Sequence, residues 1–120
     1  MAGAVLWQRS EGALVFLAGL VVTATTGADW WVALPVFFAP DLSFLAYLAG
    51  PRVGAAVYNA VHIYGFGAGV LAIGMVSGLP WLVALGALWL AHSGFDRMLG
   101  YGLKLDSGFQ DTHLGRIGRG

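Results

Sequence analysis

Four long apolar runs, separated by short breaker segments, constrain this chain more than any other feature. The three joints read TTGAD, AGPR and SGLP, and glycine or proline occurs in each of them. A helix that crosses a membrane needs about 20 apolar residues, and the runs cover residues 12–28, 30–50, 53–76 and 79–99. Because such short joints make consecutive helices antiparallel neighbours, the sequence predicts one all-α domain over residues 1–120. We expect an up-down bundle of four membrane-spanning helices, followed by a tail over residues 100–120.

The composition favours a membrane rather than water around this bundle. Hydrophobic residues make up 58% of the chain and charged residues 10%, whereas a soluble domain carries about 25% charged residues. The six basic and six acidic residues cancel, so we expect no nucleic-acid partner. The absence of cysteine excludes disulfides, thiolate zinc sites and cysteine nucleophiles. The lipid bilayer is therefore the expected main partner.

All six basic residues fall on one side of the predicted bundle. Arg9 precedes the first run, and Arg52 lies between the second and third. The other four come at or after the end of the fourth run: Arg97, Lys104, Arg116 and Arg119. Because cytoplasmic segments of membrane proteins carry an excess of lysine and arginine, we expect a multi-pass protein with both termini in the cytoplasm.

The third run contains two pairs of glycines at small-xxx-small spacing. Gly65 and Gly69 are four residues apart, as are Gly74 and Gly78. This spacing lets membrane helices approach closely, within one chain or between chains. We expect intrachain packing, while a homodimer or association with other membrane subunits stays open.

Ionisable side chains gather in the cytoplasmic half of the predicted spans. Counted from the joint at Pro51, Asp41 and His62 lie at similar depth on neighbouring helices, roughly 15 Å in at ~1.5 Å of rise per residue. His92 lies a turn or more closer to the cytoplasm, and Asp96 lies near the boundary. Ionisable groups cost about 2.5–3.5 kcal/mol each at the centre of a membrane helix. Groups placed there usually face the protein interior and serve a function.

The pattern of these residues is compatible with a metal site. His92 and Asp96 are four residues apart, so they share one face of the fourth predicted helix. They could bind one ion together, and His62, Asp41 and His113 could complete its shell. Imidazole and carboxylate ligands without thiolates favour zinc, manganese or iron. Such an ion lowers the pKa of water and so supports hydrolysis.

Three other interpretations stay open. His92 and Asp96 could form a hydrogen-bonded pair that only stabilises a helix end. His62 and His92 could bind one haem iron, although their unequal depths argue against it. Asp41 and His62 could form the proton or ion relay of a small transporter, although the outer half of the predicted spans holds almost no ionisable group.

Several motifs contain these polar residues: PDLSFLAYLAG, YNAVH, HSGFDRMLGYGLK and FQDTHLG. Together they resemble a bacterial family of small four-span integral membrane proteins classed as a domain of unknown function. The resemblance covers nearly the whole chain. It implies that the family's polar positions are Asp41, Ser43, Tyr58, Asn59, His62, His92, Asp96, Arg97, Thr112 and His113. It implies a bacterial inner (cytoplasmic) membrane location, and it supplies no activity.

We therefore expect an intramembrane metal-binding protein and, within that class, a metal-dependent hydrolase of a lipid-like substrate at the cytoplasmic half of the bilayer. The expected metal ligands are His62, His92 and Asp96, with zinc, manganese or iron as the ion. Asp41 and His113 would serve as catalytic base or further ligand. Tyr58, Asn59 and Arg97 would orient the substrate. The alternative is a small transporter or proton-coupled carrier, or a non-catalytic accessory subunit of a membrane complex.

Overall fold

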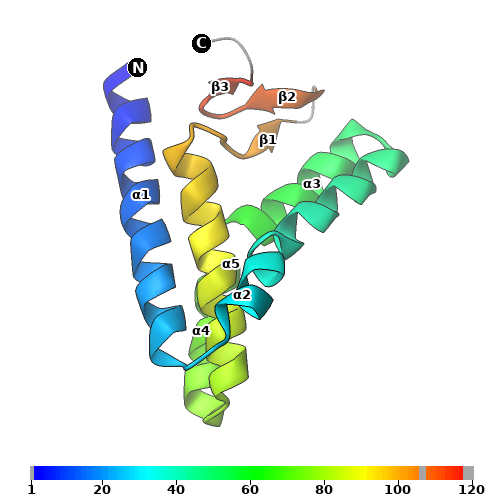
Figure 1. Cartoon of the computed structure of the whole chain (residues 1–120). Coiled ribbons are helices and arrows are strands. Elements are labelled where there is room, and N and C mark those ends of the chain that lie inside the picture. Colours follow the sequence, from blue (N-terminus) through cyan, green and yellow to red (C-terminus); the bar gives the residue numbers. More distant parts are fainter. Residues whose placement is uncertain (1, 106–107, 118–120) are drawn as a thin grey trace.

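The chain folds into a series of helices followed by a small antiparallel sheet (Figure 1). The computed structural model describes residues 2–105 and 108–117. The helices are α1 (Ala2–Thr25), α2 (Trp30–Phe37), the 3-10 helix η1 (Ala39–Ala49), α3 (Pro51–His62), α4 (Tyr64–Ser77) and α5 (Pro80–Met98). The strands are β1 (Lys104–Leu105), β2 (Gly108–Thr112) and β3 (Gly115–Arg116). The predicted all-α class is confirmed, and the small sheet is an addition that the sequence did not indicate.

Helix α5 lies at the centre of the fold, and both α1 and α4 pack along it (Figure 1). Small residues bring the backbones into contact. A Cβ atom on Gly94 of α5 would lie 2.6 Å from the carbonyl oxygen of Gly12 in α1. A Cβ atom on Gly67 of α4 would lie 2.6 Å from the amide nitrogen of Leu90 in α5. This close packing is the kind that small residues permit between membrane helices.

Two of the four predicted spans are broken. The run over residues 30–50 divides into α2 and η1, and Pro40 lies at the start of η1, where its fixed φ and missing N–H are tolerated. The run over residues 53–76 divides at Ile63, which has extended backbone angles, and α3 and α4 are bent there by 45°. As a result α3 runs obliquely away from α5 (Figure 1). A regular four-helix up-down bundle is therefore not confirmed.

Two helical segments, Gly3–Thr25 and Trp30–Ala49, are long and apolar enough to cross a membrane. A third qualifies if the bent pair Pro51–His62 and Tyr64–Ser77 counts as one span. The predicted fourth span corresponds to α5, whose last two turns carry buried polar residues and which α1 and α4 cover. Among the described residues the structure thus supports two or three apolar candidate spans, and four are not confirmed. Their many exposed large apolar side chains suit contact with lipid.

The residues after α5 fold back against the ends of the helices. The sheet has the order β1-β2-β3, with both pairs antiparallel, and β1 and β2 contact α3. The start of α1 and the strand β3 lie at the same end of the molecule (Figure 1). Residues 106–107 and 118–120 of the predicted tail lie outside the described residues.

Candidate metal centre

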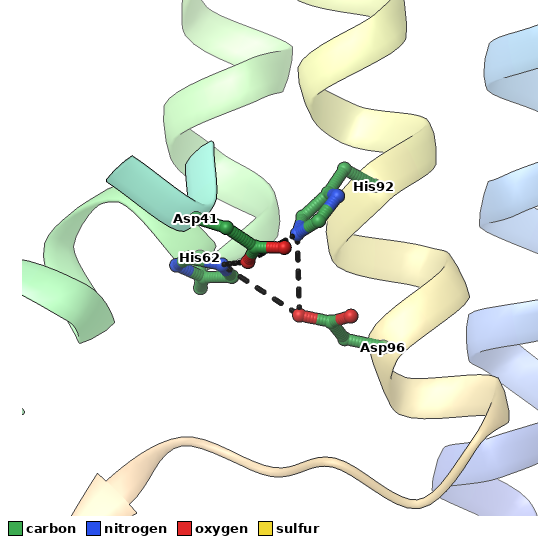
Figure 2. A group of neighbouring side chains, drawn as sticks. All are labelled: Asp41, His62, His92 and Asp96. Carbon is green, nitrogen blue, oxygen red and sulfur yellow. Dashed lines mark hydrogen bonds and ion pairs between the residues drawn. The ribbon is translucent and has the colours of Figure 1, made fainter. Parts of the chain in front are cut away.

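Four side chains from three helices point toward one another at the cytoplasmic side predicted from the sequence (Figure 2). Asp41 comes from the first turn of η1, His62 from the last residue of α3, and the other two, His92 and Asp96, from α5. One ligand atom from each lies within 4.8 Å of all the others. His62 and His92 are completely buried, Asp96 nearly so, while the Asp41 side chain is 34% exposed.

The distances between these atoms match the edges of a small coordination shell. Nε2 of His92 lies 3.0 Å from Oδ1 of Asp41 and 3.4 Å from Oδ2 of Asp96. Nε2 of His62 lies 3.4 Å and 3.6 Å from the same two oxygens. Ligands held about 2.0–2.1 Å from a tetrahedral zinc ion are roughly 3.4 Å apart. The four nitrogen–oxygen separations are therefore close to those between ligands of one ion, and the other two separations are no longer than 4.8 Å.

A hydrogen bond at Nδ1 of His62 determines where the proton of this ring lies, and it leaves Nε2 facing the cluster without a proton. Nδ1 of His62 lies 2.8 Å from the carbonyl oxygen of Tyr58. A carbonyl only accepts, so Nδ1 carries the proton and donates it. In the neutral ring, Nε2 then presents a lone pair to two carboxylate oxygens. Such an arrangement is repulsive unless a cation, either a metal ion or a proton, lies between these atoms.

His92 is enclosed by aromatic side chains. Its ring lies 5.2 Å from that of Phe37 and 6.2 Å from that of Phe38, both edge-on. Among the described residues, its Nδ1 atom has no hydrogen-bond partner, so Nε2 makes the polar contacts of this ring. The apolar surroundings strengthen electrostatic interactions inside the cluster and make an unbalanced charge costly.

The break between α3 and α4 is part of how the site is built. Because α3 ends at His62, the carbonyl of that residue is left without a helical partner. The buried Arg97 guanidinium fills this role: it donates to the carbonyl oxygens of His62 and Tyr101, at 2.9 Å each. The Trp89 indole donates to the carbonyl oxygen of Val61 at 2.7 Å. Side chains of α5 thus hold the end of α3 in place beside the cluster.

Tyr58 supports the cluster from one turn before His62. Its ring stacks on the His62 ring with a centroid distance of 3.7 Å. Its hydroxyl donates to Oδ2 of Asp96 at 3.3 Å. Phe44 stacks on Tyr58, at 5.5 Å between centroids. Tyr58 therefore orients both a histidine and a carboxylate.

The remaining sequence-predicted residues contact the backbone of the segment after α5. The Asn59 amide accepts a hydrogen bond from the backbone N–H of Lys104 and donates one to its carbonyl oxygen, at 2.6 Å and 2.8 Å. His113 accepts a hydrogen bond at Nδ1 from the backbone N–H of Leu103, at 2.8 Å. Burial and the nearby Arg97 charge lower the pKa of His113. The structure thus brings His62, His92, Asp96 and Asp41 together, and places His113 outside the cluster.

A pocket of about 320 Å3 adjoins the cluster. It is lined by Asp41, Phe44, Tyr58, Asp96, Tyr101, Lys104 and Ile117. In the sequence, Lys104 fitted an anionic headgroup but was more simply explained as a topology signal; the structure places it in this wall. Burial lowers the pKa of Lys104 to about 8, while the charges of Asp96 and Asp41 act in the opposite direction. A lysine with this pKa is mostly protonated at neutral pH.

The rings of His62 and His92 lie closer together than the residue count suggested. The sequence count put His92 a turn or more away from His62, but their ring centroids are 5.2 Å apart. This proximity removes the earlier objection to a haem, but the carboxylates of Asp41 and Asp96 lie against both Nε2 atoms. A porphyrin between the two histidines would have to displace these carboxylates. The geometry therefore favours a small cation.

This fold and site define a class of protein: helical and apolar, with a buried Asp–His–His–Asp cluster. The chain belongs to the family described as Domain of unknown function (DUF4260), which matches residues 5–117. No curated protein and no solved structure matches the chain. The family description supplies no activity, so the function has to be argued from the site.

Proposed function

We propose that this protein is a divalent-metal-binding protein of the bacterial inner membrane, with both termini in the cytoplasm, and that it hydrolyses a lipid-like substrate. The observation that carries the proposal is the convergence of four ligand atoms, from Asp41, His62, His92 and Asp96, within 4.8 Å of one another. Two neutral imidazoles and two carboxylates balance the charge of one divalent ion. Zinc, manganese and iron accept this set of ligands.

The surroundings of the four side chains also support a bound cation. The hydrogen bond of His62 to a backbone carbonyl is typical of metal-ligating histidines, whose second nitrogen is usually held in this way. Tyr58 holds the Asp96 carboxylate similarly. Two buried carboxylates without a cation would be costly in apolar surroundings. A resident metal ion removes that cost.

The chain's own residues suggest how a hydrolase would use the ion. A divalent ion supplies a Lewis acid and lowers the pKa of water. Asp41 has the most exposed carboxylate of the cluster and lines the pocket. With Oδ1 as its ligand atom, its other oxygen, Oδ2, is suited to accept a proton from the attacking water. The hydroxyl of that water joins the acyl or phosphoryl group, and a proton goes to the leaving oxygen. Asn59 and Arg97 position the backbone around the site in this scheme, and His113 holds the segment after α5.

Metal content tests the proposal. The full chain is purified in mild detergent without added metal and analysed for zinc, manganese and iron, beside the variants His92→Ala and His113→Ala. We expect about one ion per chain in the wild type and a loss of most of it during purification of His92→Ala, because His92 supplies one of the two imidazole ligands. His113→Ala is the matched control and should keep its metal, since His113 lies outside the cluster.

The metal content also separates a metal site from the proton relay. A relay would place a proton rather than a metal ion between the histidines and carboxylates. Wild-type protein that takes up none of the three metals, even after incubation with each, would refute the metal site and favour the relay. Equal loss of metal from both variants would show that the ion is not held by the cluster.

A further inference from the structure

The pocket beside the cluster combines charged and apolar walls. Asp41 and Asp96 contribute the wall shared with the metal site, and Lys104 lines the same pocket. Phe44 and Ile117 provide apolar surface. A ligand in this pocket would contact the metal cluster and the lysine at once.

Lys104 is held in this position by several contacts. Asn59 binds both polar groups of its backbone, and its ammonium lies 5.0 Å from the centre of the Tyr58 ring. Only 4% of the residue is exposed. An ammonium at the wall of a pocket, beside a cluster that would hold a cation, can contact an anion bound there.

The charge balance changes when a metal ion binds. With both histidines neutral, the carboxylates of Asp41 and Asp96 and the ammonium of Lys104 sum to −1; a proton shared between the histidines and the carboxylates brings the sum to 0. A divalent ion in place of that proton changes the sum to +1. The metal-loaded pocket therefore attracts an anionic group that can contact both the ion and the lysine, as phosphate oxygens do.

The helix beside the pocket presents a row of exposed leucines. In a 3-10 helix, residues three apart lie on one face. Leu42, Leu45 and Leu48 of η1 form such a row and are 69%, 67% and 90% exposed. Asp41 and Phe44, on the adjacent row, line the pocket. A molecule with an anionic head in the pocket could thus lay its apolar part along η1, within the lipid.

We propose that this pocket binds the phosphate group of an amphiphilic phosphate ester, with Lys104 and the metal ion as its two contacts. This inference rests on the metal site of the proposed function. The shared chemistry is the phosphate group, which either a lipid headgroup or free inorganic phosphate could provide. The exposed leucine row favours the lipid.

Binding measurements on the metal-loaded full chain test this inference. The protein is held in a maltoside detergent, which contains no phosphate, and is titrated by calorimetry with inorganic phosphate in one arm and short-chain phosphatidic acid in the other. Lys104→Gln should weaken binding of the phosphate group about tenfold or more, because a charge-assisted hydrogen bond is lost. Lys104→Arg keeps the charge and should bind within about threefold of the wild type. Arg52→Gln removes an exposed basic residue from the start of α3 and is the matched control.

The outcomes separate this inference from the metal site. Weaker binding of both probes in Lys104→Gln, with metal content unchanged, supports the phosphate pocket; a stronger response to phosphatidic acid identifies the lipid as the source. If the wild type holds metal but binds neither probe, or if Lys104→Gln binds as tightly as the wild type, the inference is overturned and the metal site stands. Wild-type protein without metal overturns the proposed function itself. If Lys104→Gln fails to fold, phosphate binding is measured on the wild type with and without metal. Binding only by the metal-loaded protein supports the inference, and equal binding in both forms overturns it.

Discussion

His62 is the residue on which most contacts of the site depend. Its carbonyl oxygen accepts from Arg97, its Nδ1–H donates to Tyr58, and its ring stacks on Tyr58. Its Nε2 atom is thereby directed at the carboxylates. The four-residue spacing of Tyr58 and His62 was visible in the sequence, as was that of His92 and Asp96. The Arg97 contact was not, because it exists only where α3 breaks.

Residue counting did not show how close His62 and His92 come, and the reason is physical. The predicted depths assumed straight α-helices with ~1.5 Å of rise per residue. The segment that carries Asp41 is instead a 3-10 helix, with a rise of about 2.0 Å per residue, and α3 is tilted by the 45° bend. Counting residues from Pro51 therefore did not measure depth. The identity of the polar residues could be predicted, but their meeting point could not.

Replacing Arg97 should loosen the site without removing a ligand. The ammonium introduced by Arg97→Lys cannot donate to the carbonyl oxygens of His62 and Tyr101 together, as the two guanidinium nitrogens do. We expect a stability loss of about 1.5–3 kcal/mol, the usual worth of a hydrogen bond to a charged group. Metal affinity should fall by about 10–100-fold, as for other changes around metal ligands. Thermal unfolding in detergent and metal titration measure the two effects.

The exposed Arg52 provides the control for this change. Arg52→Lys lies at the start of α3, away from the cluster, and should leave both quantities unchanged. If Arg97→Lys matched Arg52→Lys in unfolding temperature and metal affinity, Arg97 would not position the end of α3.

At the scale of the elements, the periodicity of η1 explains how one segment serves both lipid and site. Its three-residue repeat puts Leu42, Leu45 and Leu48 outward and Asp41 with Phe44 beside the pocket. The apolar run predicted α-helical spacing over residues 39–49, which form a 3-10 helix. The proline at position 40 signalled a break, but not that a 3-10 helix would follow.

The glycine contacts also differ from the predicted ones. Of the predicted pairs, Gly74 packs against α5, but a Cβ on Gly69 would meet nothing within 4 Å. Gly78 ends α4 with a left-handed conformation (φ 68°). Close contacts with α5 occur instead at Gly67 of α4 and at Gly12 of α1. The four-residue spacing predicted that glycines of the third run pack against another helix. It did not predict which face of α4 packs, because that face depends on where the helix begins.

A substitution in α5 should separate packing glycines from lipid-facing ones. Gly94→Leu would insert a side chain where a Cβ already lies 2.6 Å from backbone atoms of α1. We expect a loss of stability of about 1–3 kcal/mol or more, typical of overpacking. Gly69→Leu places the same side chain in open space on α4 and should be nearly neutral. Thermal unfolding in detergent compares them, and equal unfolding temperatures would contradict the α1–α5 packing.

At the scale of the whole molecule, the arrangement of the basic residues predicted that both termini share one side. The start of α1 and the strand β3 do lie at one end of the structure (Figure 1), while the side of the membrane stays a prediction. The all-α class and the apolar character of the helices could be predicted from composition and run length. The number of spans could not, because the last turns of α5 carry buried polar residues that break the apolar run.

The lack of cysteine allows a clean test of orientation. Ser10→Cys lies in α1 near the predicted cytoplasmic side, and Ser77→Cys at the end of α4 on the opposite side; both serines are exposed. A membrane-impermeant maleimide added to intact spheroplasts should label Ser77→Cys at once. It should label Ser10→Cys only after the membrane is permeabilised. The reverse pattern would invert the topology, and equal labelling of both would contradict a span between them.

X-ray absorption at the edge of the bound metal tests the central claim most directly. It reports the ligand types and distances around the ion in the intact protein. The Asp–His–His–Asp cluster predicts two imidazole nitrogens and two carboxylate oxygens at about 2.0–2.2 Å if the ion is zinc. The imidazole scattering should fall by half in His92→Ala protein reloaded with metal and remain unchanged in His113→Ala. A spectrum with oxygen ligands alone, and no imidazole contribution in the wild type, would contradict the site.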